Sequence, residues 1–87
     1  MKVNLNKSVV GLDGQEIQQT NLGQILANNL ASGSNPNHQK ITYWAVKLYD
    51  GEQLDLDPSD GLIFEELVNN SNLTNLVKTR IIESIER

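Results

Sequence analysis

The stretch from Ile41 to Tyr49 reads ITYWAVKLY and holds three of the four aromatic residues in this 87-residue chain. On a helix, which turns by about 100° per residue, most of its apolar side chains share one broad face. That face comprises Ile41, Trp44, Ala45, Leu48 and Tyr49. Lys40 and Lys47 project from another face, and Tyr43 and Val46 lie away from both. Because so wide an apolar arc exceeds that of an ordinary surface helix, we predict a central helix that is contacted from more than one side.

Clear signals bound this central helix. We predict it from about His38 to Asp50, with Gly51 closing it. The run GSNPN at residues 33–37 is rich in helix breakers and predicts a loop. Before that loop we predict another helix, which Thr20 or Asn21 can cap and whose apolar stripe is formed by Leu22, Ile25, Leu26 and Leu30.

The N-terminal part of the chain has the pattern of a β-hairpin. Apolar residues around a polar Lys7-Ser8 pair indicate a strand with a break; they are Val3, Leu5, Val9 and Val10. The segment Gly11-Leu12-Asp13-Gly14 is a turn signal, because Asp-Gly supplies the positive φ that tight hairpins need. We expect residues 15–18 to form the return strand, with Ile17 facing the interior. A hairpin alone is marginally stable, so it has to dock on helices.

The second half of the chain predicts one short strand and two helices. Residues 53–57 alternate between polar and apolar, which indicates a third short strand beside the hairpin. Asp57-Pro58-Ser59-Asp60 is a strong helix start, and the helix that it opens would bury Ile63, Phe64, Leu67 and Val68. We expect Asn72 to cap a final helix that runs to the C-terminus.

These elements predict a single α+β domain over residues 1–87. The N-terminal hairpin, with or without the third strand, would pack on about four helices around Trp44. A chain of this length has room for one core of modest size. It contains no cysteine, so neither a disulfide nor a thiolate-bound metal can add to its stability.

The end of the chain carries two apolar sets. Leu73, Leu76 and Val77 form one helical stripe, which also includes Arg80, and we expect Arg80 to extend along the surface or pair with an acid. The second set lies more than about 100° further round and consists of Ile81, Ile82 and Ile85. Either the helix crosses the core and buries both sets, or the isoleucines are a protein-contact surface, for a partner or a homodimer.

The charge distribution is uneven. The net charge is −4, and no Lys or Arg lies between Lys47 and Lys78. Seven acids fall in that interval: Asp50, Glu52, Asp55, Asp57, Asp60, Glu65 and Glu66. They form either a solvated acidic edge or a surface for a basic partner or a cation. A negative chain is poorly suited to nucleic acid or to an anionic membrane, so we expect neither as a partner.

No pattern for catalysis or cofactor binding emerges. Asp55, Asp57, Ser59 and Glu66 match positions 1, 3, 5 and 12 of a calcium loop, but Asp60 occupies the position that requires glycine. Pro58 also favours a helix start, so we predict a strand and a capped helix there. His38 is the only histidine, and we find neither a nucleophile elbow nor a phosphate-binding glycine loop. We therefore expect no catalytic, cofactor or metal site and no enzymatic activity.

The layout of the chain resembles that of small uncharacterised proteins encoded by bacteriophages and prophages. The resemblance lies in Leu12-Asp13-Gly14 before the helix Leu22–Asn28, then the helix Trp44–Tyr49, then an acid-started helix. It implies a viral accessory or assembly protein that acts through contacts, with self-association as one form. The alternative is an acidic protein that binds a basic or nucleic-acid-handling host partner. The opening MKVNLNKSVV has no apolar run of signal-peptide length, so we expect the host cytoplasm.

Overall fold

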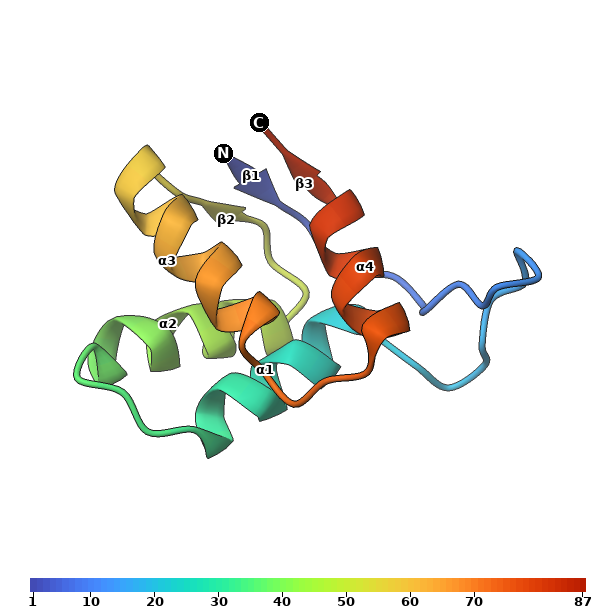
Figure 1. Ribbon diagram of the computed structural model, residues 1–87, viewed down its shortest axis with the longest axis horizontal. Coiled ribbons are helices and arrows are strands. Elements are labelled where there is room, and N and C mark those ends of the chain that lie inside the picture. The colour runs from blue at the N-terminus through green and yellow to red at the C-terminus, as the bar shows by residue number, and fades with distance from the viewer.

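The computed structural model describes all residues from Met1 to Arg87 and shows an α+β fold with four helices and a small antiparallel sheet. An antiparallel pair of helices forms one layer, and the other two helices lie beside the sheet in the second layer (Figure 1). The first pair is α1 (Leu22–Ser32) and α2 (His38–Tyr49). The second layer contains α3 (Pro58–Asn69), α4 (Asn75–Glu83), β1 (Lys2–Val3), β2 (Leu54–Asp55) and β3 (Ile85–Glu86). None of the helices is long and apolar enough to cross a membrane.

The sheet joins three distant parts of the chain, in the order β2-β1-β3. Val3 lies opposite Leu54 on one side and Ile85 on the other, and these side chains face the core. The backbone N–H of Leu56 donates to the Met1 carbonyl at 2.8 Å, which extends the pairing of β1 with β2. Residues 53–57 thus contain the short strand that the sequence predicts, and β2 lies at an edge of the sheet.

The predicted N-terminal hairpin is wrong. β1 pairs with β2 and β3, and the only bridge between the two expected hairpin strands joins Val10 to Glu16. Ile17 does not face the interior, since 43% of its surface is exposed. The expected return segment has one apolar residue, too few to hold a strand on the core, whereas Val3 reaches buried partners from elsewhere in the chain.

The helix pair is close-packed through small residues. A Cβ atom at Gly23 would lie 2.7 Å from the backbone oxygen of Leu48, so glycine is what allows the two helices to approach. The side chain of Asn21 caps α1 by accepting from the Gln24 N–H at 3.0 Å, as one of the two expected caps. α2 ends as predicted, with Asp50 at its C-cap and Gly51 at φ +80°.

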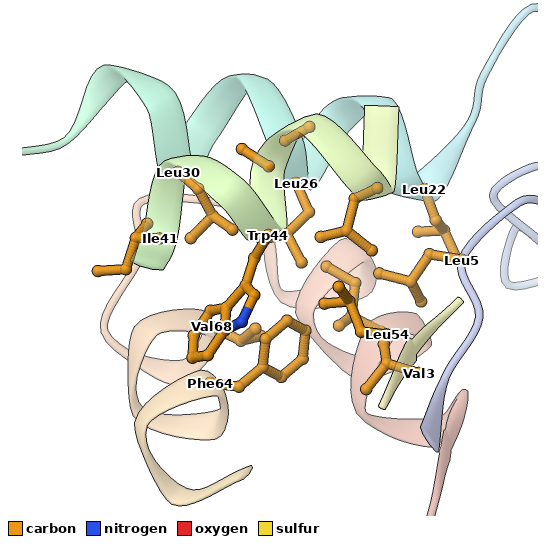
Figure 2. Packing of buried hydrophobic residues seen from close by; sticks show 14 of the residues in the cluster. Val3, Leu5, Leu22, Leu26, Leu30, Ile41, Trp44, Leu54, Phe64 and Val68 are labelled. Carbon is orange, nitrogen blue, oxygen red and sulfur yellow. The ribbon is translucent and has the colours of Figure 1, made fainter. Parts of the chain in front are cut away.

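The core lies between the two layers (Figure 2). Trp44 from α2 meets Phe64 from α3 edge to face, with ring centroids 6.1 Å apart. Ile41, Ala45 and Leu48 are buried on the same side of α2 as Trp44. The expectation that α2 is contacted from more than one side is correct, since α1 packs along one side of it and β2 and α3 along another, but its outer side stays open. Tyr43, Val46 and Tyr49 are accordingly 61%, 54% and 53% exposed.

The second half of the chain follows the local signals except at its end. Asp57 caps α3 by accepting from the Asp60 N–H at 2.8 Å. Asn72 does not cap α4, because its side-chain oxygen accepts a hydrogen bond from Asn29 at 2.7 Å. The cap is Thr74, and α4 ends at Glu83 before the chain continues into β3.

Candidate functional site

The segment from Val9 to Ile17, here called the projection, extends away from the two layers (Figure 1). Its base is fixed in the globule, since Val9 is buried in the core. Its tip is the turn Gly11-Leu12-Asp13-Gly14, and Leu12 is 92% exposed there. No other large apolar side chain of the chain is so open to water.

Backbone hydrogen bonds within the projection fix its shape. Gly11 N–H donates to the Gln15 carbonyl at 2.8 Å, and Ile17 N–H donates to the Val9 carbonyl at 2.8 Å. The Asp13 carboxylate accepts from the Gln15 N–H at 3.0 Å, and Gly14 has a φ of +82°. The sequence prediction of a turn here is thus correct, although the strands expected beside it are absent.

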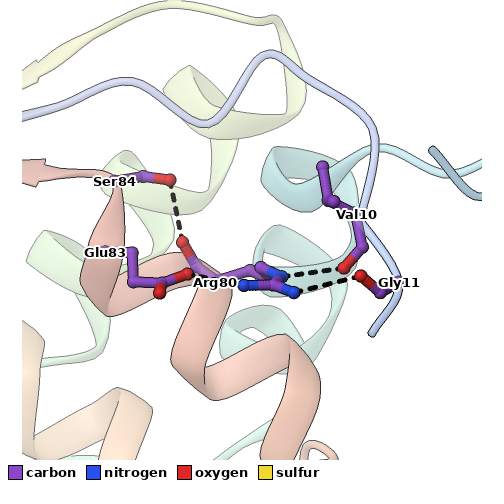
Figure 3. Close-up of polar contacts among 5 residues, drawn as sticks. All are labelled: Val10, Gly11, Arg80, Glu83 and Ser84. Atoms are coloured by element: carbon purple, nitrogen blue, oxygen red, sulfur yellow. Dashed lines mark hydrogen bonds and ion pairs between the residues drawn. The ribbon is translucent and has the colours of Figure 1, made fainter. Parts of the chain in front are cut away.

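Arg80 ties the projection to α4 (Figure 3). Its Nε donates to the Val10 carbonyl at 2.7 Å, and its Nη2 donates to the Gly11 carbonyl at 3.1 Å. Its Nη1 pairs with Glu83 Oε1 at 2.9 Å, which confirms the expected pairing of Arg80 with an acid. The guanidinium therefore donates to the Val10 carbonyl, shares the Gly11 carbonyl with the Gly14 N–H, and holds the base of the turn against the globule.

Thr20 closes the projection from its other end. Its hydroxyl accepts from the Val9 N–H at 3.0 Å and donates to the Ile17 carbonyl at 2.7 Å. Thr20, which the sequence offers as an alternative cap for α1, is therefore engaged in the projection. Together, the hydrogen bonds of Arg80 and Thr20 fasten the projection to the globule at two points.

The exposed end of the projection is apolar and acidic. Leu12 and Ile17 are its exposed apolar side chains, and Asp13 and Glu16 are its only charged ones. No Lys or Arg occurs between Lys7 and Lys40, so this end carries no compensating positive charge of its own. It combines a large apolar side chain with two carboxylates on an ordered turn.

The residues of the acidic edge serve several separate roles. Asp57 caps α3, Asp50 lies at the C-cap of α2, and Glu65 pairs with Arg87. Asp60 pairs with Lys40 at 2.8 Å, and this hydrogen bond and ion pair raise the pKa of Lys40 above its ordinary value. The remaining members are Asp55 in β2, Glu52 before it and Glu66 on α3.

The calcium-like spacing does not form an ion-binding loop. Asp55 belongs to a strand, Asp57 caps a helix, and Ser59 and Glu66 lie on that helix. No group of three or more His, Cys, Asp or Glu side chains is placed to hold a metal ion. The residues thus have the strand and capped-helix roles that the sequence predicts.

The expected contact surface of three isoleucines is not formed. Ile81 is fully buried in the core, and Ile82 and Ile85 are partly buried against it. Because α4 ends before Ser84, Ile85 belongs to β3 and points inward beside Val3. Of the two outcomes that the sequence leaves open, the structure has the one that directs both apolar sets toward the core.

Of the several hollows on the surface, two border both helices of the pair. The larger, about 430 Å³, lies where the C-terminal ends of α1 and α3 meet the loop before α2. Its floor is apolar and its rim is rich in Asn and Ser, with Glu66 as its one ionisable side chain. The smaller, about 230 Å³, is a groove on the outer side of the helix pair, bordered by Ala27, Ala31, Ala45, Val46 and Tyr49.

Comparison of the chain with known protein families, characterised proteins and solved structures found no match. Function therefore has to be inferred from the projection and the exposed apolar surface. In the larger hollow, Glu66 has no second ionisable group beside it for acid–base chemistry. The projection stands out among these features, because the side chains of Thr20, which follows it in the sequence, and of Arg80, near the C-terminus, both form hydrogen bonds with it.

Proposed function

We propose that this chain is a non-enzymatic interaction protein, of the phage or prophage accessory or assembly kind, that binds a protein partner through the projection. The observation that carries the proposal is Leu12, 92% exposed at the tip of a turn that Arg80 fixes to α4. A scattered exposed leucine is ordinary. A leucine held in a fixed position on a hydrogen-bonded turn is less ordinary, because ordering a loop costs about 1–2 kcal/mol of backbone entropy per residue.

Order in the free projection favours tight binding. A contact element that is already in its bound shape loses less conformational entropy on association than a mobile loop does. Burial of a leucine side chain in a partner pocket contributes about 1.5–3 kcal/mol. Leu12 thus has the exposure and the fixed position of an anchor residue.

The charges of the projection indicate the chemistry of the partner. Asp13 and Glu16 both follow Leu12 in the projection, so a complementary surface has an apolar pocket with Lys or Arg side chains beside it. Such a partner unites the two expectations from the sequence, a contact protein and an acidic binder of a basic host protein. The resemblance to phage-encoded proteins favours a partner in the infected cell.

The test begins by placing a photo-cross-linking amino acid at position 12 in the native host cell. The matched control carries the same group at Thr79, an exposed position of α4. We expect position 12 to capture a protein that position 79 does not capture. Capture of nothing beyond the control, or of a second copy of this chain alone, would contradict the proposal.

The captured protein is then purified and its affinity is measured with three variants. We expect Leu12→Ser to weaken binding about ten- to a hundredfold, the loss of one buried leucine, and Leu12→Met to bind nearly as wild type. Asp13→Asn preserves an oxygen for the Gln15 N–H but removes the charge. It should therefore weaken binding only through the lost electrostatic attraction, and the affinity should depend less on salt. Equal affinity of wild type and Leu12→Ser would overturn the proposal.

A further inference from the structure

The outer side of the α1–α2 layer is a second exposed apolar surface, distinct from the projection. Tyr43, Val46 and Tyr49 of α2 are all more than half exposed on it. Beside them runs the groove of about 230 Å³, whose walls include Ala27 and Ala31 of α1. We call this surface the outer helix face; it comprises the exposed sides of α1 and α2.

The outer helix face is close to neutral on a chain of net charge −4. α1, with the sequence LGQILANNLAS, contains no charged residue. On α2, Lys40 is paired with Asp60 of α3, which leaves Lys47 and Asp50, one of each sign, near the exposed apolar residues. Interface centres are depleted in charge and enriched in tyrosine, and this face has both properties.

We infer that a second copy of this chain covers the outer helix face in a symmetric dimer. Two molecules of the same negative charge repel least where they meet through a neutral surface. A two-fold arrangement also requires a patch that complements itself, and one Lys and one Asp beside an apolar stripe meet that requirement. A basic partner, by contrast, would find no excess of acid on this face.

The position of Lys47 and Asp50 on α2 suits an antiparallel pairing of the two copies. If Val46 lies at the two-fold axis, Asp50 of the second copy is level with Thr42 of the first. Lys47 of the first copy is then roughly 7.5 Å along the helix axis from Asp50 of the second copy, at about 1.5 Å per residue. Both side chains lie on the same side of the interface. A lysine side chain spans that separation, so both copies form the same ion pair.

The area available predicts a weak dimer. Tyr43, Tyr49 and Val46 are 61%, 53% and 54% exposed. At roughly 200 Å² for a whole tyrosine, these three side chains together offer on the order of 300 Å² per copy. A stable interface buries about 800 Å² per partner. The remainder has to come from small and polar residues of α1, such as Gln24, Asn28 and Ala31. We therefore expect association at chain concentrations on the order of 10–100 µM.

Sedimentation equilibrium of the full chain over a concentration series tests this inference. The wild-type mass should rise from the 9.7 kDa of one chain toward twice that value. Val46→Glu places two like charges at the centre of the interface and should raise the dissociation constant at least about tenfold. Leu62→Glu is the matched control, because Leu62 is 66% exposed on α3, outside the outer helix face.

A charge exchange provides the second readout. Lys47→Glu should weaken the dimer, and the addition of Asp50→Lys to the same chain should restore it. Circular dichroism and Trp44 emission serve as the control that each variant remains folded. A wild type that remains one chain throughout, a Val46→Glu variant that dimerises normally, or a Leu62→Glu variant that does not dimerise would each overturn the inference. Leu12→Ser should leave the dimer unchanged, which separates this result from that of the proposed function.

Discussion

The Arg80 side chain lies beside apolar residues of α4 and also makes polar contacts with the projection. It follows the apolar residues Leu76 and Val77 along α4, yet its guanidinium is matched by Glu83 and by the carbonyls of Val10 and Gly11. The aliphatic stem of an arginine can pack on apolar surface while its head makes charge-assisted hydrogen bonds. One side chain therefore joins the helix surface to the projection.

Arg80→Met tests this joint. Methionine preserves the apolar stem but donates no hydrogen bond, so the Val10 carbonyl loses the Arg80 donor and the Gly11 carbonyl keeps only the Gly14 N–H. We expect the fold to persist, with a free energy of unfolding lower by about 1–3 kcal/mol. Hydrogen exchange should accelerate first at the Gly11 and Ile17 amides, which bond within the projection. Unchanged exchange at these two amides would show that Arg80 does not hold it.

At this scale the sequence shows that Arg80 needs a partner but not which one. Glu83 is three residues away, within the range of a helical pattern. Val10 is 70 residues away, and only the folded chain brings its carbonyl to Arg80. The exposure of Leu12 is likewise invisible in the sequence, where it looks like any apolar residue beside a turn.

The helices of this fold are largely encoded by local signals, and the pairing of the strands is not. Asn21 and Asp57 cap the helices that their sequences predict, because a cap depends on the next three residues. β1 instead pairs with residues 54–55 and 85–86, which no local pattern links to it. An alternation of apolar residues predicts a strand, but packing decides its partner. The α+β class was therefore predictable, and the topology was not.

Gly23→Ala tests the contact between α1 and α2. Helix propensity alone predicts a gain of up to about 1 kcal/mol for alanine in a helix. The new Cβ would lie 2.7 Å from the Leu48 backbone oxygen, and such overpacking costs about 1–3 kcal/mol. We therefore expect a net loss of stability in urea unfolding.

Gly61→Ala is the control for this change. Gly61 is also helical and buried, but its nearest neighbour is the Sδ atom of Met1, the end of a flexible side chain that can move. We expect this variant to be as stable as wild type or more stable. If Gly23→Ala is stabilising to the same degree, the helices do not approach as closely as the structure shows.

At the scale of the whole molecule, one core leaves two apolar surfaces in water. The core takes Trp44, Phe64 and Ile81, whereas Leu12 and the outer helix face remain outside it. The sequence identifies each of these residues as apolar, but which of them the core covers depends on how the layers close. For this reason the sequence left open whether the three isoleucines form a contact surface or join the core, and the structure shows that the core covers or packs against them.

Nitrogen-15 relaxation of the free protein tests most directly the claim that the projection is a preformed contact element. Backbone order parameters near 0.85 mark rigid structure, and values below about 0.6 mark a flexible segment. The hydrogen bonds of Arg80, Thr20 and the turn itself predict that residues 10–17 have order parameters close to those of the four helices. Values below about 0.6 across residues 10–17 would contradict this account, because Leu12 would then lie on a mobile loop.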